Sequence, residues 1–279
     1  MTLHYRPQTE SNSPVVALHS SASNSRQWTQ LSHDLEHRFS LHAFDLPGYG
    51  KNSLVSDHSV QGAAVSATPV IQKVEKLEAP VHLVGHSNGA GIALKVAMMR
   101  PDLVKSLTLY EPATFHILRT GDEHSKTLLG QIEFVSGIVT ASAAMGDAHG
   151  GMRHFLDYWN GEGFWDQLPG PARQKFASMI NSIMSDFANG FNEPWKLSDI
   201  RDLEIPTLIM MGLESPAVTQ RVSTLIAQAL PDARLALLPE LGHMAPISQP
   251  EWVNARILEH ITSVERSIVH CSWPSRKAA

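Results

Sequence analysis

Residues 85–89 read Gly-His-Ser-Asn-Gly and form a G-x-S-x-G motif, whose central residue, Ser87, is the candidate nucleophile of this sequence. The apolar residues 81–84 before the motif predict a strand, and residues 90–99, rich in Ala, Leu, Ile and Met, predict a helix after it. A strand, a tight turn and a helix would therefore meet at Ser87, with a strained backbone and an exposed hydroxyl. The flanking glycines fit this geometry because a strand and a helix that cross closely leave no room for larger side chains.

The elements that must position a base beside this serine follow a regular order. Six apolar runs alternate with helical patterns, which predicts an α/β fold with a mostly parallel central sheet and helices on both faces. The runs cover residues 15–18, 41–44, 81–84, 107–110, 207–211 and 235–238. Ligands of such sheets lie outside the carboxyl ends of the strands, so chemistry is expected directly after the runs. The positions selected in this way are residues 19–21, Asp45, Ser87, Glu111, Glu214 and the loop that carries His243.

The alternation of strands and helices breaks between residues 112 and about 202. We interpret residues 113–202 as a helical cap with helices over 132–144 and 172–187. Residues 1–112 and 203–264 would form a discontinuous core. Residues 265–279 would be a C-terminal tail. Aromatic side chains of the cap would then line part of an apolar pocket. The candidates are Phe155, Tyr158, Trp159, Phe164 and Trp165.

Composition limits the class of protein without defining its function. A chain of 279 residues can bury a large core. The net charge of -5 comes with no basic stripe, so nucleic acid is not an expected partner. A single cysteine, Cys271, excludes an internal disulfide. The start of the sequence lacks a signal-peptide core, and no stretch approaches the roughly 18 apolar residues of a membrane span. We therefore expect a cytoplasmic protein with no membrane partner.

Four stretches together resemble the α/β-hydrolase fold family, and the resemblance runs from residue 15 to about 264. They are Leu-His-Ser-Ser at 18–21, Asp-Leu-Pro-Gly-Tyr-Gly at 45–50, the motif around Ser87, and Leu-Gly-His-Met at 241–244. The resemblance implies a nucleophile elbow at Ser87 on an α/β-hydrolase fold with an inserted helical cap. It also implies that His243, in the loop after the last strand, is the catalytic base, while His86 points elsewhere.

The same resemblance implies an oxyanion hole formed by the backbone N–H groups of Ser21 and Asn88. Each such donor is worth about 3 kcal/mol to a developing oxyanion. In the family the first of the two loops usually begins His-Gly, whereas this sequence has His19 and Ser20. We expect the loss of the glycine to narrow or reorient this loop.

The acid that orients the imidazole is not at its usual place. The family usually has an aspartate three residues after the glycine that ends the preceding strand, and counting from Gly212 gives Ser215. Ser215 and Pro216 are interpreted as a helix N-cap followed by proline at the first helical position. Two glutamates remain: Glu111, a position from which some relatives supply the acid, and Glu214, adjacent to the vacant position. We favour Glu111 and keep Glu214 as the alternative.

Other motifs compete with this interpretation. Residues 33–37 read H-x-x-E-H, with two histidines one turn apart, as in some zinc peptidases, but Leu31, Leu35 and Phe39 indicate an ordinary helix with a solvated polar face. Asp45 is interpreted as a turn residue. The glycines of 146–151 lack a preceding strand and a P-loop lysine, which argues against phosphate binding. Neither a metal nor an organic cofactor is expected.

The function expected from these residues is acyl transfer by a serine hydrolase acting on a carboxylic ester or lactone. Three alternatives use the same fold: a carbon–carbon bond (diketone) hydrolase, a cofactor-free perhydrolase, and a small-molecule-binding protein without catalysis. A serine in place of an aspartate nucleophile argues against dehalogenase and epoxide hydrolase chemistry. The sequence does not define the acyl or alcohol preference or the oligomeric state.

Overall fold

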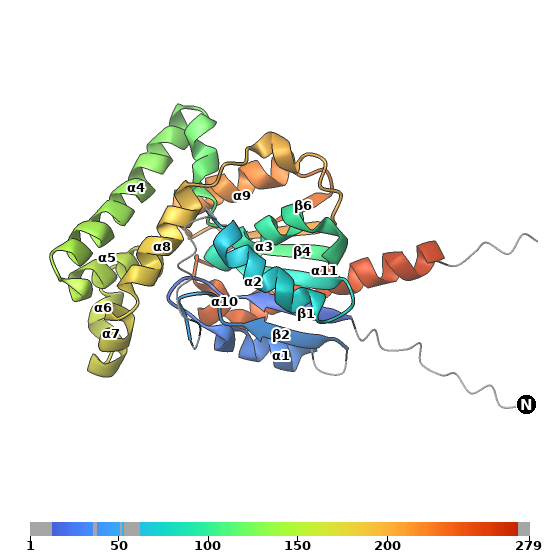
Figure 1. Cartoon of the computed structure of the whole chain (residues 1–279), viewed down its shortest axis with the longest axis horizontal. Helices are drawn as coiled ribbons and strands as arrows, with labels where there is room; N and C mark the ends of the chain where they lie inside the picture. The colour runs from blue at the N-terminus through green and yellow to red at the C-terminus, as the bar shows by residue number, and fades with distance from the viewer. Residues whose placement is uncertain (1–12, 36–37, 51, 53–61, 273–279) are drawn as a thin grey trace, which may run out of the picture.

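A six-stranded parallel sheet forms the centre of the computed structural model, which describes residues 13–35, 38–50, 52 and 62–272 (Figure 1). Every apolar run of the sequence analysis lies in a strand, because a sheet covered on both faces needs apolar side chains throughout. The predicted fold class is confirmed. The strands are β1 (Pro14–Leu18), β2 (Ser40–Phe44), β3 (Val81–His86), β4 (Val104–Tyr110), β5 (Thr207–Gly212) and β6 (Ala233–Leu238), in the order β2-β1-β3-β4-β5-β6.

Helices cover both faces of this sheet, and alternate residues of each strand face different layers. In β1, Val15 and Ala17 pack with α1 (Thr29–Leu35) and α11 (Pro250–Ser272). Val16 and Leu18 pack on the other side, with α2 (Ala64–Glu75), α3 (Asn88–Met99) and α9 (Ala217–Ala229). Short helical elements complete the core: η1 (Ser25–Trp28), η2 (Pro101–Leu103), η4 (Leu197–Ile200) and α10 (Ala245–Ser248).

Between β4 and β5 the chain forms a group of helices that we call the helical layer, beside the sheet at the left of Figure 1. It consists of η3 (Phe115–Thr120), α4 (Glu123–Ala144), α5 (Ala148–Asn160), α6 (Phe164–Gln167), α7 (Gly170–Ala177) and α8 (Ile180–Phe191). The single helix expected over 172–187 was wrong, because a turn at residues 178–179 separates α7 from α8. The layer lies within the interval 113–202, whose exact limits as a cap stay a prediction.

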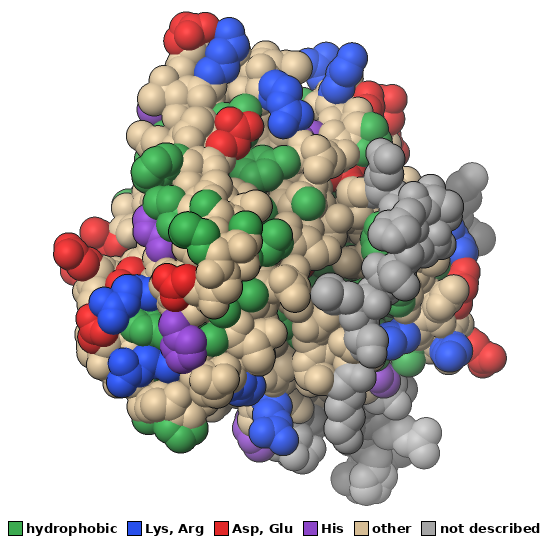
Figure 2. Space-filling view, turned by 60° about the vertical axis from the view of Figure 1, so that its left-hand side comes forward, with side chains coloured by type: hydrophobic (Ala, Val, Ile, Leu, Met, Phe, Trp, Pro, Cys, Tyr) green, Lys and Arg blue, Asp and Glu red, His purple; other side chains and the backbone are tan. Residues whose placement is uncertain are grey.

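Helix α4 is long and apolar enough, by length and composition alone, to cross a membrane. The expectation that no segment reaches that limit therefore needs correction, because Leu, Ile, Val, Phe and Ala raise the mean hydropathy of α4 and few of its residues are charged. The finding is weak, since a helix in the core of a soluble protein passes the same test. In this structure α4 packs against α5, α8 and α9. Figure 2, which brings this side forward, shows hydrophobic patches interspersed with charges of both signs.

The C-terminal boundary predicted at residue 264 does not coincide with the end of an element. Helix α11 continues to Ser272, and Glu265 pairs with His82 of β3 (2.9 Å) and with Lys105 of β4 (2.8 Å). Hydrogen bonds from Lys105, Ser13 and His82 outweigh the effect of burial and lower the pKa of Glu265 to about 2. The boundary at residue 264 stays a prediction, and residues 273–279 lie outside the described residues.

Candidate active site

Ser87 lies at the turn between β3 and α3 and has the strained backbone that the motif predicts, with φ 54° and ψ -117°. The glycines beside it are sterically required. A Cβ on Gly85 would lie 2.5 Å from the carbonyl oxygen of Gly89, and a Cβ on Gly89 would lie 2.5 Å from the carbonyl oxygen of His19. The expectation that strand and helix leave no room for side chains here is confirmed.

The structure brings Ser87, His243 and Glu111 into one hydrogen-bonded chain. Nε2 of His243 lies 3.0 Å from Oγ of Ser87, and Nδ1 of His243 lies 2.6 Å from Oε2 of Glu111. The three residues are 7%, 3% and 0% exposed, so the carboxylate and the imidazole are shielded from solvent. This arrangement can move a proton from the serine hydroxyl to the imidazole, with the carboxylate fixing the orientation of the ring.

Glu111 directly follows β4, and its backbone has φ 46°, a left-handed conformation that is costly for a non-glycine residue. Its second oxygen, Oε1, accepts hydrogen bonds from the backbone N–H of Gly212 (2.8 Å) and from Oγ of Ser215 (2.5 Å). These two bonds satisfy the side of the buried carboxylate that faces away from His243. The strained backbone and the two donors together direct Glu111 at the imidazole.

The interpretation of Ser215 as a helix N-cap was wrong. Helix α9 begins after Pro216, which makes no side-chain capping bond, while the hydroxyl of Ser215 is used by Glu111. Glu214, the alternative acid, has an exposed side chain, and its backbone N–H bonds to the carbonyl oxygen of Leu241. The structure therefore places Glu111, and not Glu214, against His243.

The loop after β1 carries Ser21, and Asn88 begins α3, so the two proposed oxyanion donors flank Ser87 from different segments. Within the described part of the chain, neither backbone N–H bonds to another backbone carbonyl or to a side chain. Ser20 does not have a positive φ, so no glycine is required at its position. The left-handed residue of this loop is Ala22 (φ 58°). Ser20 instead donates its backbone N–H and its hydroxyl to Gln27, both at 3.1 Å.

His86, inside the motif, points away from the nucleophile, as expected. Its Nε2 lies 2.8 Å from the backbone carbonyl oxygen of His243, and its Nδ1 lies 3.1 Å from Nε2 of Gln27. Burial, followed by the nearby charge of His243, lowers the pKa of His86 well below its usual value. A neutral ring that donates from Nε2 and accepts at Nδ1 fits both contacts and links the loop of Ser20 to the loop of His243.

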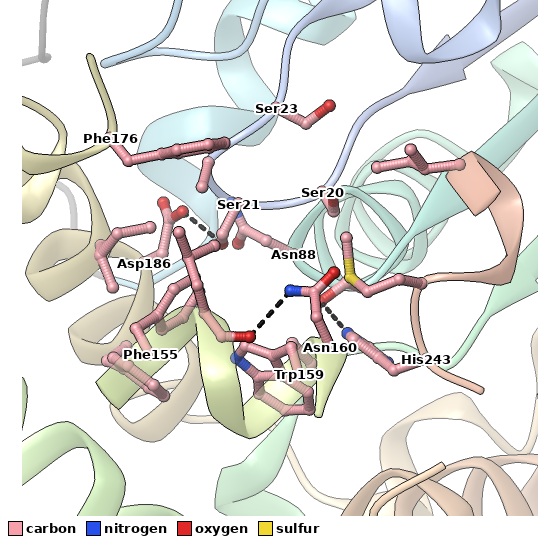
Figure 3. Close-up of a pocket in the computed structure, with 18 of the residues that line it drawn as sticks. Ser20, Ser21, Ser23, Asn88, Phe155, Trp159, Asn160, Phe176, Asp186 and His243 are labelled. Carbon is pink, nitrogen blue, oxygen red and sulfur yellow. Dashed lines mark hydrogen bonds between the residues drawn. The ribbon is translucent and has the colours of Figure 1, made fainter. Parts of the chain in front are cut away.

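A cavity of about 290 Å³ lies above Ser87, between the strand ends and the helical layer (Figure 3). Phe155, Trp159 and Phe164 line it, as expected from the sequence, and the Trp159 ring packs on the imidazole of His243 with centroids 4.3 Å apart. The expectation was wrong for Tyr158 and Trp165, which do not line this cavity. Both sit on turns of their helices that face elsewhere, and sequence periodicity does not fix that rotation within the layer.

The sequence analysis missed Asp186, a half-buried aspartate of α8 that also lines the cavity. Its oxygen Oδ2 accepts hydrogen bonds from Oγ of Ser21 (2.5 Å) and from the hydroxyl of Tyr49, and the side chain of Asn88 lies close enough to stabilise the charged form of the same carboxylate. A lone aspartate on the polar side of a helix pattern gives no signal in the sequence. Only the packing of α8 over the strand ends identifies it.

No group of three or more metal-ligating side chains occurs among the residues that the structure describes. In the H-x-x-E-H segment, α1 ends at Leu35, and residues 36 and 37 lie outside the described residues. Asp45 lies at a turn, where its carboxylate accepts a hydrogen bond from the backbone N–H of Ser25 (2.8 Å). This agrees with its interpretation as a turn residue.

The model of the alpha/beta hydrolase family matches residues 15–256. The chain belongs to the α/β-hydrolase family. This α/β hydrolase is 22% identical over 262 residues to (E)-2-((N-methylformamido)methylene)succinate hydrolase of Acinetobacter baylyi, with 91% of each chain covered. It is 25% identical over 256 residues to a pimeloyl-(acyl-carrier protein) methyl ester esterase of Nitrosomonas europaea, which covers 88% of this chain and 94% of the relative.

The fold of this α/β hydrolase is also found in solved structures. A thermophilic esterase from Thermogutta terrifontis superimposes with a TM-score of 0.67 at 20% identity, over 92% of each chain. At that identity the likeness concerns the fold alone. The two relatives by sequence named above are a hydrolase and an esterase, so the family relationship supports hydrolysis as the class of reaction.

Proposed function

We propose that this protein is a serine hydrolase that cleaves a carboxylic ester or a lactone through an acyl-enzyme intermediate. One observation carries the proposal: the hydrogen-bonded chain from Ser87 through His243 to Glu111, at 3.0 and 2.6 Å. In this proposal Ser87 is the nucleophile, His243 is the general base and Glu111 is the acid of the triad. The name of the esterase relative supports an ester as substrate.

The proposed reaction begins when Oγ of Ser87 attacks the carbonyl carbon and Nε2 of His243 takes the hydroxyl proton. The oxyanion that forms receives hydrogen bonds from the backbone N–H groups of Ser21 and Asn88. His243 then gives its proton to the leaving alkoxide oxygen, and the acyl group stays on Ser87. Water attacks the acyl-enzyme, again with His243 as base, and releases the acid. These steps transfer only protons and an acyl group, so they need no metal or organic cofactor.

The cavity supports a substrate with an apolar portion, because Phe155, Phe164 and Phe187 form much of its wall. Carbon–carbon bond hydrolysis and perhydrolysis would use the same three residues. A carbon–carbon bond hydrolase would differ in the bond that breaks. A perhydrolase would differ in the nucleophile that attacks the acyl-enzyme, which would be peroxide instead of water. A binding protein without catalysis would keep the cavity and leave Ser87 unreactive.

The first test is to measure initial hydrolysis rates of p-nitrophenyl esters, from acetate to long acyl chains, with the wild type and Ser87→Ala in parallel. We expect turnover that disappears in Ser87→Ala, together with covalent labelling of Ser87 by a fluorophosphonate. Labelling without ester turnover would favour a carbon–carbon substrate. Absence of both would favour the binding protein, because a serine without an activated base does not react with the label.

A further inference from the structure

Asp186 of α8 reaches the two residues whose backbone N–H groups we assign to the oxyanion (Figure 3). Its carboxylate accepts a hydrogen bond from the hydroxyl of Ser21 at 2.5 Å, and the side chain of Asn88 lies close enough to stabilise its charged form. Ser21 lies in the loop after β1, whereas Asn88 begins α3, so one side chain from the helical layer joins two separate segments of the core.

The loop that Asp186 holds does not have a relaxed backbone. Ala22, next to Ser21, has φ 58°, and such a conformation persists in a non-glycine residue only when surrounding contacts impose it. The hydroxyl of Tyr49, which lies near the backbone N–H of Ala22, donates a hydrogen bond to the same carboxylate. The carboxylate therefore supports residues 21 and 22 both directly and through Tyr49.

The charge of this carboxylate depends on the same contacts. Burial raises the pKa of Asp186 to about 7, while the hydrogen bonds from Ser21, Tyr49 and Asn88 act in the opposite direction. No ion pair within the described residues includes Asp186, although Lys175 lines the same cavity. The donors that stabilise the carboxylate are thus the groups whose positions it fixes.

We propose that Asp186 is a positioning residue, which holds Ser21 and Asn88 so that their backbone N–H groups converge on the oxyanion. Helix α8 would then complete the oxyanion hole from outside the sheet. This inference rests on the proposed serine hydrolase function. It extends that function, because the helical layer would then help to stabilise the transition state in addition to enclosing the substrate.

The test compares Asp186→Asn with the wild type on the best p-nitrophenyl ester and on an alkyl trifluoromethyl ketone of matched chain length. Asn has the same size but is neutral, so its amide oxygen accepts weaker hydrogen bonds from Ser21 and Tyr49 than the carboxylate does. Oγ of Ser87 attacks the carbonyl carbon of the ketone, and His243 takes the hydroxyl proton. The ketone oxygen then becomes an oxyanion that lies in the oxyanion hole. We expect kcat to fall about 10- to 100-fold, the inhibition constant of the ketone to rise by the same factor, and KM to change less than about threefold.

Ser182→Ala is the matched control, because Ser182 also joins α8 to the core through a 2.9 Å hydrogen bond to the carbonyl oxygen of Gly48, without touching either oxyanion residue. We expect it to leave kcat and the ketone affinity within about twofold of the wild type. If Asp186→Asn does not fold, Ser21→Ala replaces it. This variant keeps the backbone N–H and removes only the bond to Asp186, and a smaller loss in the same direction is expected.

The inference would be wrong if Asp186→Asn kept the wild-type kcat and the wild-type affinity for the ketone. It would also be wrong if KM rose at constant kcat, because that result would indicate that Asp186 contacts the substrate. An equal loss in Ser182→Ala would indicate a general effect of docking α8 and would also overturn it. If the wild type itself shows neither Ser87-dependent turnover nor inhibition by the ketone, the proposed function fails and this inference fails with it.

Discussion

Ser215 donates a 2.5 Å hydrogen bond from its Oγ to Oε1 of Glu111, and it does so from the position at which relatives usually have their aspartate. The carboxylate after β4 and the hydroxyl after β5 meet beside the imidazole of His243. Because Oε2 of Glu111 is used by His243, the two oxygens of the carboxylate have separate partners. A serine at position 215 is thus compatible with a carboxylate supplied by the neighbouring strand.

Replacing Glu111 by Gln is expected to lower kcat by about 10³- to 10⁴-fold, because an amide can fix the imidazole in the wrong tautomer and cannot stabilise its charged form. Glu214→Gln is the matched control and should change kcat little, since the Glu214 side chain is exposed. Steady-state rates on the best p-nitrophenyl ester measure both. A large loss in Glu214→Gln with little loss in Glu111→Gln would reassign the acid.

Ser215→Ala should lower kcat by a smaller factor, about 3- to 30-fold. Glu111 keeps its hydrogen bond from the N–H of Gly212 and its contact with His243. It loses one hydrogen-bond donor to its buried carboxylate, and the free-energy cost of that loss is about 1–3 kcal/mol at most. Ser267→Ala, which removes an exposed hydroxyl bonded to the carbonyl of Ser263, serves as the control. Rates and thermal unfolding are measured together. Unchanged kcat in Ser215→Ala would show that this hydrogen bond does not contribute to orienting the acid.

Gly89→Ala is expected to prevent folding or to lower stability severely, because the new Cβ would meet two backbone carbonyl oxygens, that of Leu18 at the end of β1 and that of His19 directly after it. Gly130→Ala in α4 is the opposite case: nothing lies within 4 Å of its Cβ, and alanine should stabilise the helix by up to about 1 kcal/mol. Soluble yield and Tm report both effects. A Gly89→Ala protein with wild-type Tm would contradict the close crossing of β1 and α3.

Stability should fall as the pH drops from about 6.5 towards 4, because several buried histidines are neutral in the folded state. Burial, followed by the charge of Arg234, lowers the pKa of His260 to about 4, whereas the unfolded chain has about 6.5. Between these values the unfolded state binds more protons, so the free energy of unfolding increases with pH across this window.

His260→Gln tests this dependence away from the candidate site. Gln can accept from Arg234 and donate to the carbonyl oxygen of Pro206, the two partners of the imidazole, but it does not titrate. We expect a smaller difference between the Tm at pH 7 and at pH 5 than in the wild type, with unchanged activity. The remaining difference reflects other histidines such as His19, whose pKa burial also lowers to about 4. An identical pH dependence in both proteins would contradict the assignment to His260.

The sequence by itself determined the sheet, the turn at Ser87 and the placement of His243 in the loop after the last strand. These features depend on local patterns: continuous apolar runs for strands that are buried on both faces, and glycines where the chain crosses itself. It also limited the acid to Glu111 or Glu214, since only these two glutamates follow strands next to the vacant position.

Only the tertiary structure decided which glutamate reaches the imidazole, because that contact joins residues 132 positions apart and depends on where each side chain points after its strand ends. The same holds for Ser215, whose hydroxyl local capping rules assigned to a helix, and for Asp186, which is an ordinary polar residue until α8 packs over the loop of Ser21. Hydrogen bonds between distant segments leave no period or spacing in the sequence. They exist only once the sheet and the helical layer have brought those segments together.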